Sequence, residues 1–142
     1  MKENDLRIGN WVNINNTPHQ IYRIDYKEVN LIKMGYLAIC GIEKLQPIEL
    51  TEELLMKIGF EKIEIIEKQL YMYYKKVSID NCDYLLDFRV MPKDECIVLY
   101  VMKKEDADVD YSTIFYNDNI KYLHQLQNAY YCLTGQELEV EL

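Results

Sequence analysis

Short runs of β-forming residues, separated by turn residues, fill most of this 142-residue chain and constrain its fold more than any other feature. Apolar and polar side chains alternate within the runs, as expected for strands with one face on a core and the other in water. The spacing predicts a small, bent β-meander or barrel in the first part and an antiparallel sheet in the second. The predicted strands cover residues 6–14, 20–26, 29–34, 36–42, 63–67, 70–79, 82–91, 96–103, 111–116 and, as a short edge strand, 137–142.

Two segments carry helix signals. Thr51 is a candidate N-cap for a short helix, which Gly59 would end in the left-handed conformation. A longer amphipathic helix runs from about residue 120 to Thr134 and stops at Gly135. Its wide apolar stripe predicts that this helix packs on the antiparallel sheet.

Together these elements predict an α+β fold. We expect residues 1–48 to form an N-terminal β part and residues 49–142 to form an α+β part, unless both share one core. A chain of this length buries roughly 68% of its unfolded surface, so neither a disulfide nor a metal is needed to hold it.

The four cysteines, Cys40, Cys82, Cys96 and Cys132, form no Cys-x-x-Cys pair and have no histidine at zinc-ligand spacing. We therefore predict buried, reduced thiols, with no metal and no cofactor. The first residues are charged, and nowhere do enough apolar residues follow one another to cross a membrane. The expectation is a cytoplasmic protein without a membrane partner.

The net charge of -8 comes mainly from the end of the chain, because residues 105–142 carry eight acidic side chains and one basic side chain. Proteins that bind a phosphate backbone need a basic stripe, which releases counterions from the nucleic acid. A nucleic-acid partner is therefore disfavoured.

Catalytic patterns are absent from the sequence. The five glycines lie too far apart for a phosphate-binding loop. His19 and His124 are the two histidines, and neither belongs to a serine or cysteine nucleophile motif. We therefore predict that the protein is not an enzyme.

The face of the last helix opposite its apolar stripe is the strongest candidate site. It carries one charge among uncharged hydrogen-bonding groups, whereas a solvated helix face is usually rich in glutamate and lysine. This composition predicts a surface for a protein partner or for self-association, unless the N-terminal strands cover it. The candidate residues are Lys121, His124, Gln127, Asn128 and Tyr131.

A second candidate site is a pair of aromatic rings in the N-terminal strands. Trp11 and Tyr22 could stack on a base or a nucleotide, which would make the protein a ligand or nucleic-acid binding module. Tyrosine is abundant, with 13 residues, and suits surfaces that are half buried in an interface. A third alternative is an acidic inhibitor of a basic host protein.

Several segments resemble a family of short uncharacterised proteins encoded by bacteriophages and mobile elements of gut bacteria. They are LRIGNWV (6–12), PIELTEE (47–53), GF (59–60), IKYLHQLQN (120–128) and LTGQEL (133–138). The family has no assigned activity, so the resemblance implies a genomic setting, the cytoplasm of a bacterial host, and no catalytic residues. Our leading hypothesis is a non-enzymatic accessory protein that acts by protein–protein binding or self-association.

Overall fold

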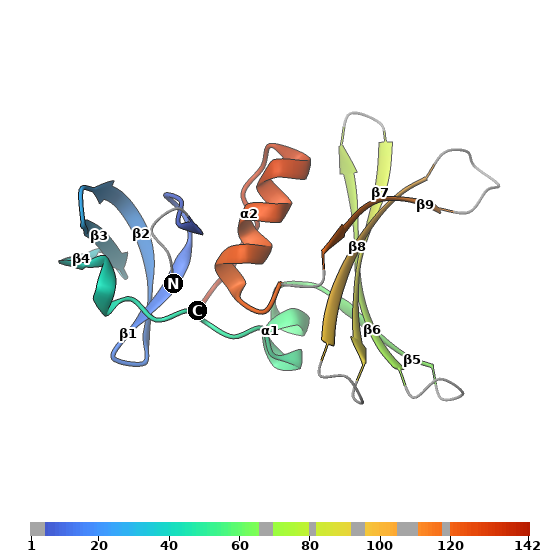
Figure 1. The fold of residues 1–142 in the computed structure, drawn as a ribbon, viewed down its shortest axis with the longest axis horizontal. Coiled ribbons are helices and arrows are strands. Elements are labelled where there is room, and N and C mark those ends of the chain that lie inside the picture. Colours follow the sequence, from blue (N-terminus) through green and yellow to red (C-terminus); the bar gives the residue numbers. More distant parts are fainter. Residues whose placement is uncertain (1–4, 66–69, 80–81, 92–95, 105–110, 118–119) are drawn as a thin grey trace. The chain divides into compact units, whose positions relative to one another are not determined.

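The computed structural model describes residues 5–65, 70–79, 82–91, 96–104, 111–117 and 120–142. Within these residues the chain forms two antiparallel sheets and two α-helices (Figure 1), which confirms the predicted α+β fold. The first sheet, in the order β1-β2-β3-β4, consists of β1 (Trp11–Ile14), β2 (Thr17–Asp25), β3 (Glu28–Lys33) and β4 (Tyr36–Gly41). The second, in the order β5-β6-β7-β8-β9, consists of β5 (Glu61–Ile65), β6 (Leu70–Ile79), β7 (Cys82–Met91), β8 (Cys96–Lys104) and β9 (Tyr111–Asn117). The helices are η2 (Ile42–Lys44, a 3-10 turn), α1 (Glu52–Lys57) and α2 (Leu123–Thr134).

The chain divides into two compact units. The first contains residues 1–50 and 121–142, and the second contains residues 51–120. The predicted boundary after residue 48 lies close to the observed one. The structure corrects the other end of the division, because α2 belongs to the first unit and contacts β1. The physical reason is a set of hydrogen bonds between α2 and the N-terminal segment, described below.

Tight turns connect the strands of the first unit. Asn15 and Asn16 both have positive φ between β1 and β2, which is the backbone of a two-residue hairpin turn. Met34 and Gly35 repeat this conformation between β3 and β4. The strand predicted for residues 6–14 begins only at Trp11, because a turn with φ of +92° at Gly9 interrupts the extended chain.

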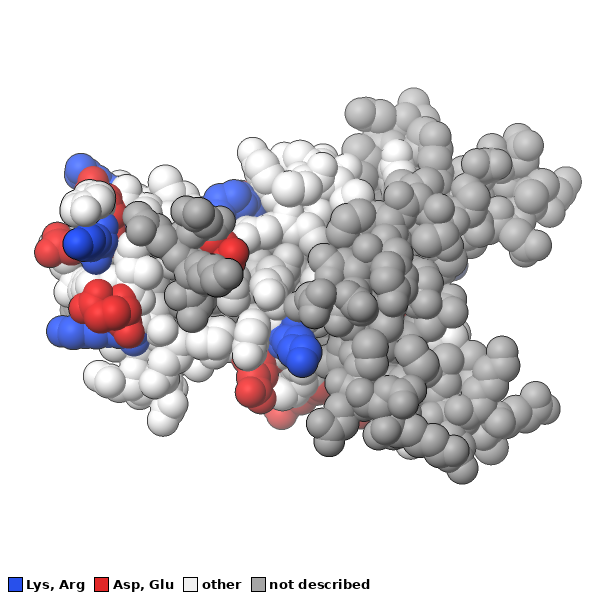
Figure 2. All heavy atoms as spheres, viewed as in Figure 1, with Lys and Arg blue, Asp and Glu red and all other residues white. Residues whose placement is uncertain are grey.

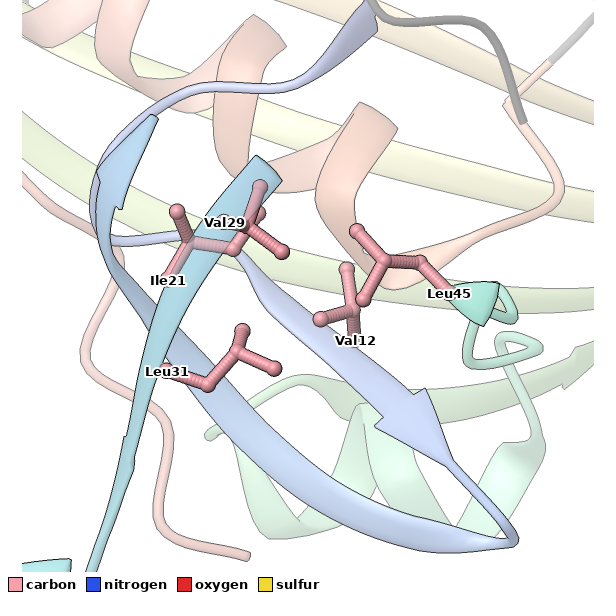
Figure 3. Packing of buried hydrophobic residues seen from close by; sticks show 5 residues of the cluster. All are labelled: Val12, Ile21, Val29, Leu31 and Leu45. Atoms are coloured by element: carbon pink, nitrogen blue, oxygen red, sulfur yellow. The ribbon is translucent and has the colours of Figure 1, made fainter. Parts of the chain in front are cut away.

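The core of the first unit lies on one side of its sheet. Alternation along β3 points Val29 and Leu31 inward, and Leu31 stands opposite Ile21 of β2. After β4, η2 leads the chain back to β1, where Asn13 and Gln46 exchange backbone hydrogen bonds of 2.8 and 2.9 Å. β1 and β4 do not pair, so the sheet is an open meander and not a closed barrel. Its buried cluster, seen in Figure 3, is Val12, Ile21, Val29, Leu31 and Leu45.

The second unit begins as its sequence predicts. The Thr51 hydroxyl accepts a 3.2 Å hydrogen bond from the Leu54 amide and caps α1. Gly59, with φ of +87°, then reverses the chain, and the Phe60 amide donates to the Leu55 carbonyl at 3.0 Å. Phe60 packs edge to face on Phe88 of β7, with ring centroids 5.5 Å apart, so α1 is anchored to the centre of its sheet.

The structure overturns two predictions. The strand predicted for residues 137–142 is not present. Cys132 is exposed, so the prediction of a buried thiol is wrong at this position, while Cys40 is half-buried. The side chains of Cys82 and Cys96 lie outside the described residues. No helix within the described residues is long and apolar enough to cross a membrane.

Two leucines of the first sheet allow a direct test of its inward and outward faces. We expect Leu31→Ala to lower the free energy of unfolding by about 2–5 kcal/mol, because Leu31 is fully buried. Leu37→Ala, an identical change at a position that is 68% exposed, should stay within about 0.5 kcal/mol at a protein concentration that keeps the chain monomeric. Chemical denaturation of both variants measures the difference. Equal losses would contradict the observed facing of the strands.

Candidate functional site

Helix α2 is attached at its start to the segment that follows the first sheet. Leu123 donates a 2.8 Å backbone hydrogen bond to the Ile48 carbonyl, and Leu50 donates one of 3.0 Å to the Lys121 carbonyl. The Gln125 side chain accepts hydrogen bonds from the amides of Lys121 and Tyr122, at 2.9 and 3.1 Å, and so satisfies donors at the helix N-terminus. These bonds fix which side of α2 faces β1.

Gln127 lies on that side and is 1% exposed. Its side-chain oxygen accepts a 2.9 Å hydrogen bond from the Trp11 amide, and its side-chain nitrogen donates to the Gly9 carbonyl at 3.2 Å. The side-chain amide therefore pairs a backbone donor and a backbone acceptor, as a neighbouring strand would.

Asn128 continues this pairing one residue further along α2. Its oxygen accepts from the Asn10 side chain at 2.9 Å and from the Arg7 guanidinium at 3.3 Å. Its nitrogen donates to the Asp5 carbonyl at 2.8 Å. Asn10 is itself fully buried and accepts a 2.8 Å hydrogen bond from the Arg7 amide. The amide groups of α2 thus bind the N-terminal segment rather than a separate molecule.

Arg7 extends the contact to the C-terminal end of the helix. Its guanidinium lies 4.0 Å from the centre of the Tyr131 ring and forms a two-pronged pair with the Glu137 carboxylate. The hydrogen bond from Arg7 lowers the pKa of Glu137, and the same bond raises the pKa of Arg7. Tyr131 remains 40% exposed, so only part of its ring is covered.

The structure therefore corrects the predicted orientation of the helix face. His124 and Gln127 are buried, Asn128 is half-buried and bonded to the N-terminal segment, and Lys121 and Tyr131 are exposed. The unusual polar composition of this face has an intramolecular cause, because buried backbone groups of the N-terminal segment need partners. Sequence periodicity identified the face but did not show which part of the chain covers it.

Gln127→Leu tests this structural role. We expect a loss of roughly 1–3 kcal/mol in the free energy of unfolding, because the Trp11 amide loses its partner, whereas the Gly9 carbonyl keeps its 3.1 Å hydrogen bond from the Gln20 side chain. Gln136→Leu is the matched control at an exposed position and should change stability by about 0.5 kcal/mol or less. Thermal or chemical unfolding gives the comparison, and two equal values would argue against the hydrogen-bonded role of Gln127.

His124 is unsuited to be a general base in this setting. Its side chain is 2% exposed, its Nδ1 makes no hydrogen bond within the described residues, and its ring stacks on Tyr122 at 5.9 Å between centroids. Burial lowers the pKa of His124 below its ordinary value of 6.5, and the negative charge of Asp5 opposes this effect. The folded state therefore favours the neutral form of the His124 ring.

This burial makes a prediction about pH. The folded state binds a proton at His124 less readily than the unfolded chain does, so the stabilising contribution is complete above pH 6.5 and is lost as the pH falls below it. We expect the free energy of unfolding to fall between about pH 7.5 and pH 5.5, and the fall to be smaller in His124→Phe, which keeps an aromatic ring. Denaturation at both pH values measures the two slopes. A His124→Phe slope equal to that of the wild type would contradict the assignment, and His19→Phe is the control.

The two rings of the second candidate site take neighbouring positions. Trp11 is half-buried and stands opposite Gln20 in the β1–β2 register, while Tyr22 lies two residues further along β2 and is 59% exposed. The register between β2 and β3 shifts at Tyr22, which is the extra residue of a bulge and turns outward there.

A third surface was missed by the sequence reading. Of the ten large apolar side chains that are exposed among the described residues, six lie between Tyr22 and Ile39. Four of these six lie on the β3–β4 hairpin and on β4. We define the β4 surface as Met34, Tyr36, Leu37 and Ile39, which are 86, 81, 68 and 67% exposed. The sequence does hint at this surface, because the stretch from Met34 to Gly41 contains no charged residue. Strand alternation, however, assigns half of such a stretch to the core and does not show that its outer side chains are apolar and exposed.

The hairpin turn within the β4 surface is locally unfavourable. Met34 has φ of +47°, in the left-handed region that asparagine and glycine adopt more readily. A long apolar side chain at this turn is therefore not explained by local stability. Such a residue at an exposed tip suggests a role in contact.

The described part of the chain gives no support for a metal site, and it does not include the loop on which the inhibitor alternative depends. No three histidine, cysteine, aspartate or glutamate side chains come together there in an arrangement that could hold a metal ion. The acidic loop at residues 105–110, which contributes to the inhibitor alternative, lies outside the described residues. Comparisons with family models, curated proteins and solved structures find no match to the chain.

Proposed function

We propose that this protein is a non-enzymatic accessory protein that acts by protein–protein binding or self-association through the β4 surface. The resemblance of its terminal segments to proteins of phages and mobile elements suggests that it works in the cytoplasm of a bacterial host. The single observation that carries the proposal is the exposure of Met34, Tyr36, Leu37 and Ile39 along one strand and its hairpin.

The chemistry of the β4 surface supports contact with protein. Aromatic residues and methionine are enriched at protein interfaces. Leu37 and Ile39 are two residues apart on β4 and therefore share one face of the strand. On the face of the first unit seen in Figure 2, charged side chains of both signs are interspersed with uncharged ones. An interface here would have an apolar centre and a mixed polar rim, which is the usual composition of protein–protein contacts.

A ligand-binding role at Trp11 and Tyr22 is the second candidate. The neighbouring positions of the two residues and the outward turn of Tyr22 favour it. Stacking of a base on Trp11 would change tryptophan fluorescence. Because the chain contains one tryptophan, any change in this fluorescence reports on Trp11. Titration with nucleotides and oligonucleotides separates this candidate from the first.

Affinity capture from a bacterial lysate tests the leading proposal. We expect a protein bound by the wild type to be lost with the double variant Leu37→Lys/Ile39→Lys, because two charges would replace the apolar contact. Ile63→Lys is the matched control, an exposed isoleucine on β5 of the other sheet. It should retain the captured protein, as identified by mass spectrometry. Equal capture by all three proteins would show that the β4 surface is not the binding surface.

A further inference from the structure

The backbone of β4 has one unused edge. β4 is the last strand of its sheet, and among the described residues only β3 pairs with it. The two-residue turn at Met34 and Gly35 makes Lys33 and Tyr36 the closing pair of the hairpin, which exchanges both of its hydrogen bonds. The N–H and C=O groups of alternate residues must then point the other way. At Leu37 and Ile39 they point to the open edge.

This edge lacks the usual protection against strand pairing. Natural edge strands carry charged residues, prolines or bulges that prevent the addition of another strand. β4 has no charged residue and no proline, and its pairing with β3 is continuous. By contrast, the edge strand β5 carries Glu61, Lys62 and Glu64. The far side of β1 is occupied in part by the pairing of Asn13 with Gln46.

The occupant that fits this edge is an extended, uncharged strand, and β4 itself meets that description. In an antiparallel pair of two β4 strands related by a two-fold axis at Ala38, Leu37 of each copy stands opposite Ile39 of the other. Each such pair exchanges two backbone hydrogen bonds and places two aliphatic side chains together. An axis at Ile39 would instead place Leu37 against Gly41, whose outer face is covered by the Glu43 carboxylate.

Charge also favours a second copy at this position. The first unit carries seven basic and nine acidic side chains, whereas residues 51–120 carry nine and fifteen. Most of the net negative charge that would make two copies repel therefore lies outside the first unit. A contact between two β4 strands would therefore join the nearly neutral first units of the two copies, where charge repulsion is small.

We propose that β4 pairs in antiparallel register with β4 of a second copy of the chain, about a two-fold axis at Ala38, so that two four-stranded sheets form one continuous sheet. The inference rests on the proposed function and deepens it, because it names the occupant of the β4 surface. Backbone hydrogen bonds hold the pair together, and the Leu37–Ile39 contacts set its register.

The test is the solution mass of the purified full chain, measured by sedimentation or light scattering at increasing concentration. Reductant is present so that the exposed Cys132 cannot form an intermolecular disulfide. We expect the mass to rise from 17.0 kDa to twice that value with the wild type and with the Ile63→Lys control. Leu37→Lys/Ile39→Lys should remain a monomer, because each cross-strand pair becomes two like charges. Circular dichroism and thermal unfolding confirm that this variant is folded.

A variant with complementary charges makes the test specific for a second copy. Leu37→Lys/Ile39→Glu removes the same two apolar side chains but places lysine opposite glutamate in the proposed register. We expect it to form the dimer again, whereas a different protein bound at β4 would be lost in both double variants. If this variant stays monomeric while the wild type dimerises, the register is overturned.

Two further results overturn the dimer itself. The first is a monomeric wild type at every concentration, and the second is a dimer that persists in Leu37→Lys/Ile39→Lys. A monomeric wild type that still captures a lysate protein through the β4 surface would leave the proposed function standing and refute only the second copy. A monomer that captures nothing through that surface would refute both.

Discussion

The first unit depends on the hydrogen bonds that α2 makes to the backbone of the N-terminal segment. Gln127 pairs with the Trp11 amide and the Gly9 carbonyl, and Asn128 pairs with the Asp5 carbonyl. Buried backbone groups without partners are costly. Ile21 of β2 pairs with the Gly9 amide and the Asn10 carbonyl, and the two side-chain amides of α2 supply partners on the other side of the segment. They also join parts of the sequence more than 110 residues apart, since the Gln127 and Trp11 partners are separated by 116 positions.

This arrangement separates the structural role of residues 6–12 and 121–128 from the proposed binding role of the β4 surface. Residues 6–12 and 121–128 meet each other in the first unit, as the bonds of Gln127 and Asn128 show. Their residue types are explained by mutual contact. The β4 surface takes part in none of these bonds, and it combines exposed apolar side chains with a backbone edge that no other described strand pairs with. Substitutions at β4 can therefore leave the contact between α2 and the N-terminal segment undisturbed.

Much of the fold was predictable because its signals are local. The cap at Thr51 and the reversal at Gly59 follow from the backbone preferences of single residues, and both are present in the structure. The candidate site was less predictable, because burial depends on residues distant in the sequence. The periodicity of α2 showed that His124 and Gln127 lie opposite the apolar stripe, yet both are buried under the N-terminal segment. A polar face looks the same in sequence whether it contacts water, a partner or its own backbone.

The sequence by itself determined the α+β class, the alternation of the strands, both helix ends that glycine defines, and the absence of an obvious catalytic motif. Only the tertiary structure decided that α2 joins the first unit, that Asn128 and Arg7 bind within the chain, and that Leu37 and Ile39 stay exposed. The physical reason is the range of the forces involved. Backbone preferences and periodicity act over a few residues, whereas burial and the pairing of polar groups are settled by segments that only the folded chain brings together.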